Sequence, residues 1–162
     1  MYIIAFDLSL NSTGYSIFDK KGKLIELGSI DTKSETEIPL KLKIIGKKIL
    51  SIKRKYKISL VLIERGFTRF NHVTQKIFRV FGIVNYLFYN VEQIYITSKA
   101  VRKAVCKNGN IKKADFFIYI KSKNKRIKFS NDDEADAFAL GRAYFLLQKE
   151  KQRGSKKTGR SK

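Results

Sequence analysis

Two short apolar segments, each ending in an acid, constrain the fold of this 162-residue chain most strongly. Residues 2–7 are Tyr-Ile-Ile-Ala-Phe-Asp, and residues 59–64 are Ser-Leu-Val-Leu-Ile-Glu. Continuous apolar runs of this length are typical of central strands that are buried on both faces of a sheet. Helices on both sides of the sheet would provide that burial, as they do in α/β proteins.

The segments between and after these strands fit this arrangement. Residues 12–18 and 23–30 flank a turn at Gly22 and predict a β-hairpin, and residues 91–96 predict a fifth strand. Helical spacing of apolar residues predicts helices over residues 36–56, 73–89, 98–105, 112–120 and about 130–149. In the first of these helices, the lysines lie on the face opposite the apolar residues. We therefore predict an α/β fold with a five-stranded mixed sheet, flanked by helices on both faces, whose fourth and fifth strands run parallel to their neighbours.

The charge of the chain indicates its partner. It contains 35 Lys and Arg against 14 Asp and Glu, for a formal net charge of +21. Residues 151–162 carry six basic side chains and no acid, and we expect them to form a disordered basic tail after a domain of residues 1–150. Most of the positive charge nevertheless belongs to the domain. Such an excess predicts salt-dependent binding to the phosphate backbone of a nucleic acid.

The composition also excludes several classes of protein. The single His72 and the single Cys106 rule out a Cys-rich zinc site, a His-His zinc site and an intramolecular disulfide framework. No apolar run reaches the roughly 18 residues that a bilayer span needs, so we expect a cytoplasmic protein that is not bound to a membrane. Nothing in the sequence indicates a small-molecule cofactor.

Acids are scarce in this chain, and their positions form a pattern. Asp7 and Glu64 end apolar strands, where sites form at the carboxyl edge of a sheet. Asp133 and Asp136 share one face of the last helix, as do Asp132 and Asp136. Carboxylates converging in this way can hold two Mg²⁺ or Mn²⁺ ions roughly 3.5–4 Å apart, which activate water and stabilise a leaving 3′-oxygen. The alternative is structural, because acids in a first helical turn also cap the helix and favour its dipole.

Three segments carry a resemblance to a known family. Residues 6–15 (FDLSLNSTGY), 63–67 (IERGF) and 132–140 (DDEADAFAL) resemble the catalytic blocks of the RuvC family of Holliday junction resolvases. The resemblance covers residues 1 to about 148. It implies a ribonuclease H-like fold and a homodimer that nicks two opposed strands of a four-way DNA junction symmetrically, using Mg²⁺ or Mn²⁺, two ions per site.

The resemblance also assigns site residues. The acids that match the catalytic, metal-binding positions of the family are Asp7, Glu64, Asp133 and Asp136, with Asp132 as the alternative because consecutive acids leave the register open by one residue. Phe67 matches an aromatic placed at the junction crossover, although it could instead be a core residue with Phe70 in the exposed role. Basic residues in or between the segments that resemble the DNA-contacting part of the family are Arg102, Lys103, Lys107, Lys112 and Lys113. The alternative for each of them is a solvated basic surface.

Departures from the family bear on the substrate. Leu8 and Ser9 stand where the first strand of the family usually continues with Pro-Gly. This change, together with the high basicity, favours a broader range of branched DNA that includes forks and flaps. The small size and basicity suit a phage-encoded member, acting in a bacterial cell or in a phage-infected host cell. Residues 73–89 are apolar nearly all round, which predicts a helix covered by its own sheet on one side and by a second subunit on the other.

Three other functions fit parts of the sequence. Residues 7–14 also resemble the phosphate loop of the actin and hexokinase ATPases, but those proteins need two such domains around the nucleotide. A basic protein that coats nucleic acid without catalysis would leave the acid pattern unexplained. A ribonuclease H-like nuclease acting on RNA would explain the acids, but not the match at Phe67 or the apolar helix.

Overall fold

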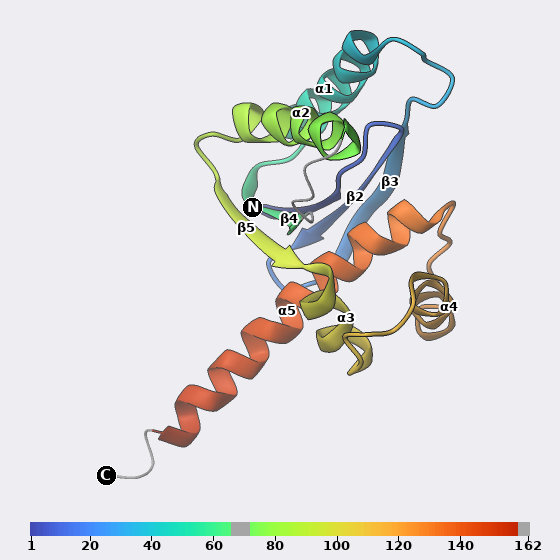
Figure 1. The fold of residues 1–162 in the computed structure, drawn as a ribbon. Coiled ribbons are helices and arrows are strands. Elements are labelled where there is room, and N and C mark those ends of the chain that lie inside the picture. Colours follow the sequence, from blue (N-terminus) through green and yellow to red (C-terminus); the bar gives the residue numbers. More distant parts are fainter. Residues whose placement is uncertain (66–71, 159–162) are drawn as a thin grey trace.

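The computed structural model describes residues 1–65 and 72–158 and contains one five-stranded sheet in the order β3-β2-β1-β4-β5 (Figure 1). The strands are β1 (Tyr2–Asp7), β2 (Ser12–Asp19), β3 (Leu24–Asp31), β4 (Ile58–Arg65) and β5 (Glu92–Thr97). Strand β2 pairs antiparallel with both β1 and β3, whereas β4 runs parallel to β1 and β5. The predicted mixed sheet, with its hairpin and two parallel connections, is confirmed.

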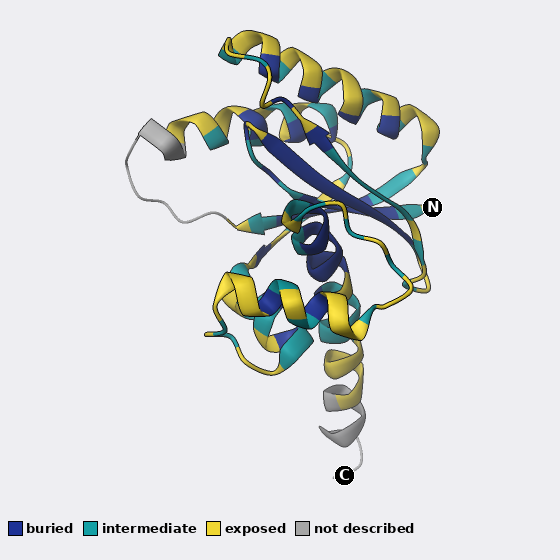
Figure 2. Cartoon of the chain, turned by 90° about the vertical axis from the view of Figure 1, so that its right-hand side faces the viewer, coloured by how far each residue is buried: buried dark blue, intermediate teal, exposed yellow. Residues whose placement is uncertain are grey.

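Helices lie on both faces of this sheet. Helices α1 (Ile38–Lys55) and α2 (His72–Leu87) cover one face, and α3 (Ser98–Cys106), α4 (Lys113–Lys123) and α5 (Asp132–Thr158) lie on the other side (Figure 1). Side chains alternate along a strand, so Ile4 and Phe6 of β1 pack toward α1 and α2, and Ala5 packs toward α3 and α5. The buried residues therefore form two cores with the sheet between them (Figure 2). Within the described residues, none of the helices combines the length and apolar character of a membrane span.

The last helix differs from its prediction. Helix α5 continues to Thr158 instead of ending at about Lys149, and its C-terminal part projects away from the sheet (Figure 1). Residues 151–158 are helical where a disordered tail was expected, and residues 159–162 lie outside the described part of the chain; the division into a domain of residues 1–150 and a basic tail stays a prediction. Gln, Lys and Arg have favourable helix propensity, so the helix continues beyond the residues that pack on the sheet.

Helix α2 is buried on one side only within this chain. Val80 and Val84 are fully buried, whereas 51% of Phe78 and 78% of Tyr86 are exposed. The burial of α2 against its own sheet agrees with the prediction, and its cover by a second subunit remains a prediction.

Helix α1 departs from the expected pattern at one position. Lys41 is buried, although the lysines of this helix were expected on its outer face.

Helix α5 approaches the sheet closely at its N-terminus. A Cβ atom at Gly14 of β2 would overlap the backbone carbonyl of Asp133. Two residues further along β2, the Ser16 hydroxyl donates a hydrogen bond of 2.8 Å to the carbonyl of Ala137. Gly14 also pairs with Asp7 across the β1–β2 ladder, so this approach sets the first turn of α5 beside the end of β1.

Replacing Gly14 with alanine is expected to destabilise the protein by about 2 kcal/mol or more, because the added methyl group overlaps backbone that cannot rotate away. Gly46→Ala on α1 is the matched control: its new Cβ would meet only a methyl of Ile83 at 3.7 Å. That change is expected to be neutral or to stabilise the helix by about 0.5–1 kcal/mol. Urea unfolding of the two variants measures the difference, and equal effects would contradict the close approach.

Candidate active site

The carboxyl edge of the sheet brings together acids that are distant in the sequence. Phe6 pairs with Ile63 in the parallel β1–β4 ladder, so the next residues, Asp7 and Glu64, lie side by side at the ends of neighbouring strands. Burial raises the pKa of Asp7 to about 8, and the negative charges of Asp136, Glu64 and Asp133 add to this increase. The other three acids predicted from the sequence therefore act on Asp7 in the structure.

The same repulsion acts on other members of this acid cluster, which we define as Asp7, Glu64, Asp133 and Asp136. Burial raises the pKa of Glu64, and the charge of Asp136 raises it further. Burial also raises the pKa of Asp136, and the charge of Asp132 adds to this increase, although Lys113 and Arg102 act in the opposite direction. Asp7, Glu64 and Asp136 are thus desolvated carboxylates that nearby cations neutralise only in part.

Lys113 distinguishes the consecutive acids of α5. Its Nζ lies 2.9 Å from Oδ2 of Asp132 and 3.2 Å from Oδ2 of Asp136. The side chain of Asp132 is 51% exposed, and its hydrogen bond with Lys113 lowers its pKa. Asp133, by contrast, is among the acids whose charge acts on Asp7. This arrangement favours Asp133 over Asp132 as the third member of the cluster.

The donor set of the cluster suits a divalent cation. As they are arranged within residues 1–65 and 72–158, no three His, Cys, Asp or Glu side chains already form a metal site. The cluster nevertheless offers only carboxylate oxygens, which are the ligands that Mg²⁺ and Mn²⁺ prefer. One member of the cluster, Asp136, already contacts a positive group, since the Lys113 ammonium lies 3.2 Å from its Oδ2. These residues therefore fit a hard divalent ion, whose charge would relieve the repulsion that raises the pKa of Asp7.

Two residues of α3 act on Glu64. Arg102 donates from Nη1 to the carbonyl of Ile111 at 2.9 Å, and its positive charge lowers the pKa of Glu64 and of Asp136. A hydrogen bond with the side chain of Ser98 also lowers the pKa of Glu64. The sequence did not single out Ser98; the available signal was its position directly after β5, whose Ile96 pairs with Glu64.

The other predicted DNA contacts are placed less uniformly. Lys103 and Lys112 are exposed, on α3 and just before α4. Lys107 forms an exposed ion pair of 3.3 Å with Glu150, roughly 20 Å along α5 from Asp136, so the structure does not bring Lys107 to the acid cluster. The predicted contact at Phe67, and its alternative Phe70, lie outside the described residues.

Fold and site together define a class of protein. A mixed sheet in the order β3-β2-β1-β4-β5, with acids at the ends of two central parallel strands and at the start of the last helix, is that of the ribonuclease H-like nucleases. The family model described as crossover junction endodeoxyribonuclease RuvC matches residues 3–143. The chain therefore belongs to the RuvC family.

Individual proteins agree with this assignment. The crossover junction endodeoxyribonuclease RuvC of Rickettsia typhi is 29% identical over 156 residues, which cover 92% of this chain and 99% of that protein. A Thermus thermophilus RuvC structure in complex with Holliday junction substrate has a TM-score of 0.76 at 13% identity, covering 93% of this chain and 96% of that one. The structure of the fowlpox virus Holliday junction resolvase has a TM-score of 0.57 at 19% identity, and the match covers 91% of this chain and 99% of that one. The predicted family, enzyme class and ribonuclease H-like fold are confirmed.

Proposed function

We propose that this chain resolves four-way DNA junctions by paired, symmetric nicks, acting as a homodimer that requires Mg²⁺ or Mn²⁺. The observation that carries the proposal is the convergence of Asp7, Glu64, Asp133 and Asp136 at one edge of the sheet in a RuvC-family chain. Forks and flaps are included as substrates, because the net charge of +21 favours phosphate binding in general. The chain would act in the cytoplasm of a bacterial cell or of a phage-infected host cell, and its phage origin stays a prediction.

The acid cluster is the proposed site of the cations. Asp7, Glu64, Asp133 and Asp136 would hold two of them, which when bound activate water for attack on the phosphodiester and stabilise the leaving 3′-oxygen. Ser98 orients Glu64 through its hydrogen bond. Cutting in this way leaves 5′-phosphate and 3′-hydroxyl ends, so a ligase can seal the paired nicks.

Two basic residues of the site would hold the strand. Lys113 pairs with Asp132 and Asp136 in the free protein, and from this position it can transfer to a phosphate oxygen of bound DNA. Arg102 lies close enough to the cluster to lower the pKa of Glu64, so it can neutralise charge that develops on the phosphate. Lys103 and Lys112, both exposed beside these two residues in the sequence, would extend the contact to neighbouring phosphates. Lys107, which forms an exposed ion pair with Glu150, stays a predicted DNA contact away from the acid cluster.

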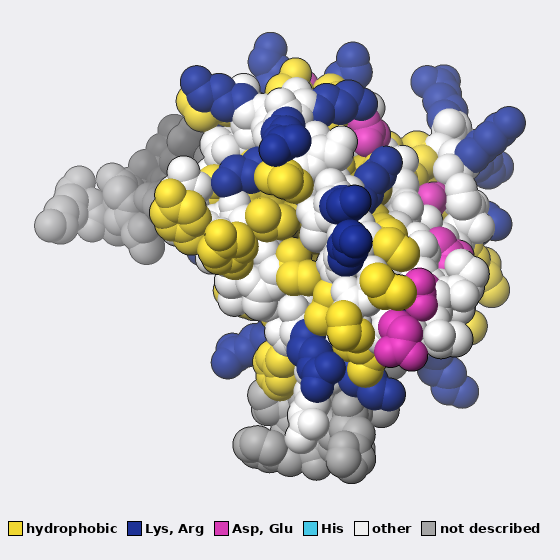
Figure 3. Space-filling model, turned by 90° about the horizontal axis from the view of Figure 1, so that it is seen from above, with side chains coloured by type: hydrophobic (Ala, Val, Ile, Leu, Met, Phe, Trp, Pro, Cys, Tyr) yellow, Lys and Arg dark blue, Asp and Glu magenta, His cyan; other side chains and the backbone are white. Residues whose placement is uncertain are grey.

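The exposed side of α2 supports a homodimer. Phe78 is 51% exposed, and its ring lies 5.9 Å from that of Phe81. Hydrophobic side chains gather between basic ones on the face of the molecule formed by α1 and α2 (Figure 3). Exposed aromatic side chains on a helix favour a protein partner, and two copies related by a twofold axis would present two sites symmetrically to a junction.

The Phe78→Asp variant is expected to weaken dimerisation by about a hundredfold, because the interface would bury an unpaired charge. Light scattering during size-exclusion chromatography measures this change across a range of protein concentrations. Ile118→Asp on α4 is the matched control, since Ile118 is also apolar and is 64% exposed. If Phe78→Asp remains as dimeric as Ile118→Asp, the dimer does not use this side of α2.

A cleavage assay tests the proposed function directly. Labelled four-way junctions, forks and plain duplex are incubated with the protein, with and without Mg²⁺ or Mn²⁺, and the cut positions are mapped on both strands. We expect metal-dependent cuts at symmetric positions in the junction and none in the duplex. Binding without cutting under either metal would overturn the proposal in favour of a non-catalytic binding protein.

A further inference from the structure

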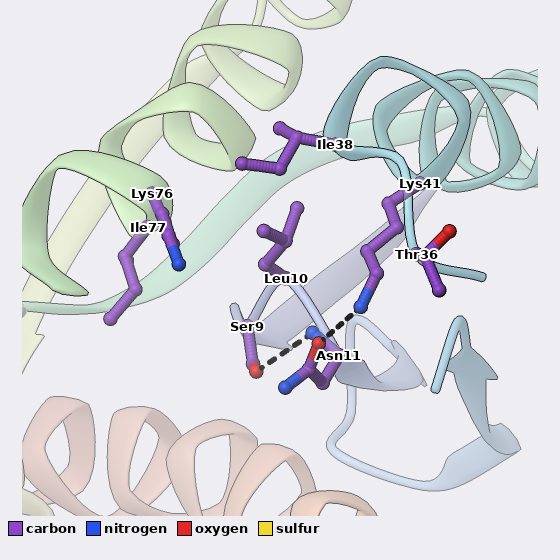
Figure 4. A pocket seen from close by; sticks show the side chains of 8 residues that line it. All are labelled: Ser9, Leu10, Asn11, Thr36, Ile38, Lys41, Lys76 and Ile77. Atoms are coloured by element: carbon purple, nitrogen blue, oxygen red, sulfur yellow. Dashed lines mark hydrogen bonds between the residues drawn. The ribbon is translucent and has the colours of Figure 1, made fainter. Parts of the chain in front are cut away.

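We propose that a cavity beside the acid cluster binds a phosphate group of the DNA strand that is cut, an inference that rests on the proposed function. The cavity has a volume of about 300 Å³ and lies between the β1–β2 connection and the N-terminal turns of α1 and α2 (Figure 4). None of the described residues that line it carries a carboxylate. Its polar side chains are those of Ser9, Asn11, Thr36, Lys41 and Lys76.

Lys41 is the strongest indication that the cavity receives an anion. It is only 9% exposed, and its Nζ donates a hydrogen bond of 2.6 Å to Oδ1 of Asn11. An ammonium group has three donors, so the bond to Asn11 leaves two of them for another acceptor. In the part of the chain that the structure describes, no carboxylate lies within ion-pair distance of Lys41. Burying a charge without a counter-charge is costly, and an anion in the cavity would offset this cost.

Other donors converge on the same space. The side chain of Lys76 on α2 points toward the β1–β2 connection from one side and that of Lys41 from the other (Figure 4). The Ser9 hydroxyl oxygen accepts a hydrogen bond of 3.3 Å from the backbone N–H of Asn11, which leaves its own proton free to donate. The carboxylate of Glu35, which directly precedes the lining residue Thr36, does not itself line the cavity. It accepts hydrogen bonds from the backbone N–H groups of Thr36 and Glu37. Two ammonium groups and a hydroxyl are the donors that a phosphate needs.

The wall of the cavity is held in place before any ligand binds. The Thr13 hydroxyl donates a hydrogen bond of 2.6 Å to the carbonyl of Ser9, and the Thr32 hydroxyl donates one of 2.5 Å to the carbonyl of Leu10. The backbone N–H of Thr32 bonds to the carbonyl of Asn11 at 2.9 Å. Binding would therefore require little ordering of the loop.

Its position assigns the phosphate to the cut strand. Ser9 is two residues from Asp7, at most about 7 Å along the chain. A strand whose scissile phosphate lies at Asp7 therefore places a neighbouring phosphate within reach of the cavity. The cavity would thus fix the strand a nucleotide or two from the cut, independently of the cations in the acid cluster.

Gel-shift binding of a four-way junction, without divalent cations and over a series of salt concentrations, tests this assignment. Lys41→Met is expected to weaken binding about tenfold and to reduce the salt slope by about one. The matched control is Lys57→Met. Lys57 is exposed and directly precedes β4, so it lies at the opposite end of this strand from Glu64. Lys76→Met, at an exposed residue, repeats the test if Lys41→Met does not fold.

Neutral methylphosphonates, placed one at a time beside the cut, locate the phosphate. One position should weaken binding of the wild type but not of Lys41→Met. If folded Lys41→Met and Lys76→Met both behave like Lys57→Met and no position shows this coupling, the inference is overturned. Thermal stabilisation by inorganic phosphate that is lost in Lys41→Met, without any change in junction binding, would assign the cavity to free phosphate instead. Failure of the proposed function is distinguishable, because the wild type would then bind junctions without cutting them.

Discussion

Replacing Glu64 with glutamine is expected to lower metal-dependent cutting of a four-way junction by about three orders of magnitude or more, while junction binding is preserved. The amide keeps the size of the side chain and a hydrogen bond with Ser98, but it removes a carboxylate from the cluster. It also removes one negative charge that faces the DNA, so binding should be equal or tighter. Single-turnover cutting and gel-shift assays on the same protein measure the two effects separately.

Asp115→Asn is the matched control for this variant. Asp115 is an exposed acid in the first turn of α4, close in sequence to Lys113 but outside the cluster. This variant should cut at the wild-type rate. Full activity of Glu64→Gln would remove Glu64 from the catalytic machinery, and loss of both binding and cutting with a lowered melting temperature would assign it a structural role.

The consecutive acids of α5 provide a finer test of the same cluster. Asp133→Asn should lose cutting as Glu64→Gln does, because Asp133 acts on Asp7 in the structure. Asp132→Asn should retain cutting within about tenfold, because Asp132 is half exposed and pairs with Lys113. The reverse ranking would show that the register of the catalytic acids is shifted by one residue.

The sequence was most informative where one strand or helix decides the outcome. The apolar runs before Asp7 and Glu64 predict buried strands, and parallel strands end at one edge, so the convergence of these two acids follows from local pattern. The contact of Ser98 with Glu64 was not predicted, because it depends on the register between β4 and β5. A register between parallel strands is not encoded in either strand alone.

Two lysines show the same limit. Lys113 was predicted only as a DNA contact, but the packing of α4 beside α5 also pairs it with Asp132 and Asp136. Lys41 was expected on the outer face of its helix, but the β1–β2 connection supplies Asn11 as a partner and covers it. In both cases a segment distant in the sequence provides the environment of the charge, and helical periodicity alone does not predict such a contact.

Without divalent cations, the stability of the protein is expected to fall as the pH rises from about 4 to about 8 through the titration of Asp7. Its pKa is 3.8 in the unfolded chain and about 8 in the folded protein, so the folded state holds a proton that the unfolded state releases in this range. The cost to folding is absent below about pH 4 and reaches up to about 6 kcal/mol above pH 8. The raised pKa values of Glu64 and Asp136 act in the same direction.

Asp7→Asn isolates this contribution, because groups with a lowered pKa, such as Glu26, have the opposite pH dependence in both proteins and cancel in the comparison. The stability of the variant should match that of the wild type near pH 4 and exceed it at pH 8. Thermal unfolding in the presence of a metal chelator measures this difference. Adding Mg²⁺ at pH 8 should stabilise the wild type far more than the variant, since a bound cation favours the ionised carboxylate. Parallel pH profiles for the two proteins would mean that Asp7 ionises freely, and the case for a desolvated cluster that needs a cation would be lost.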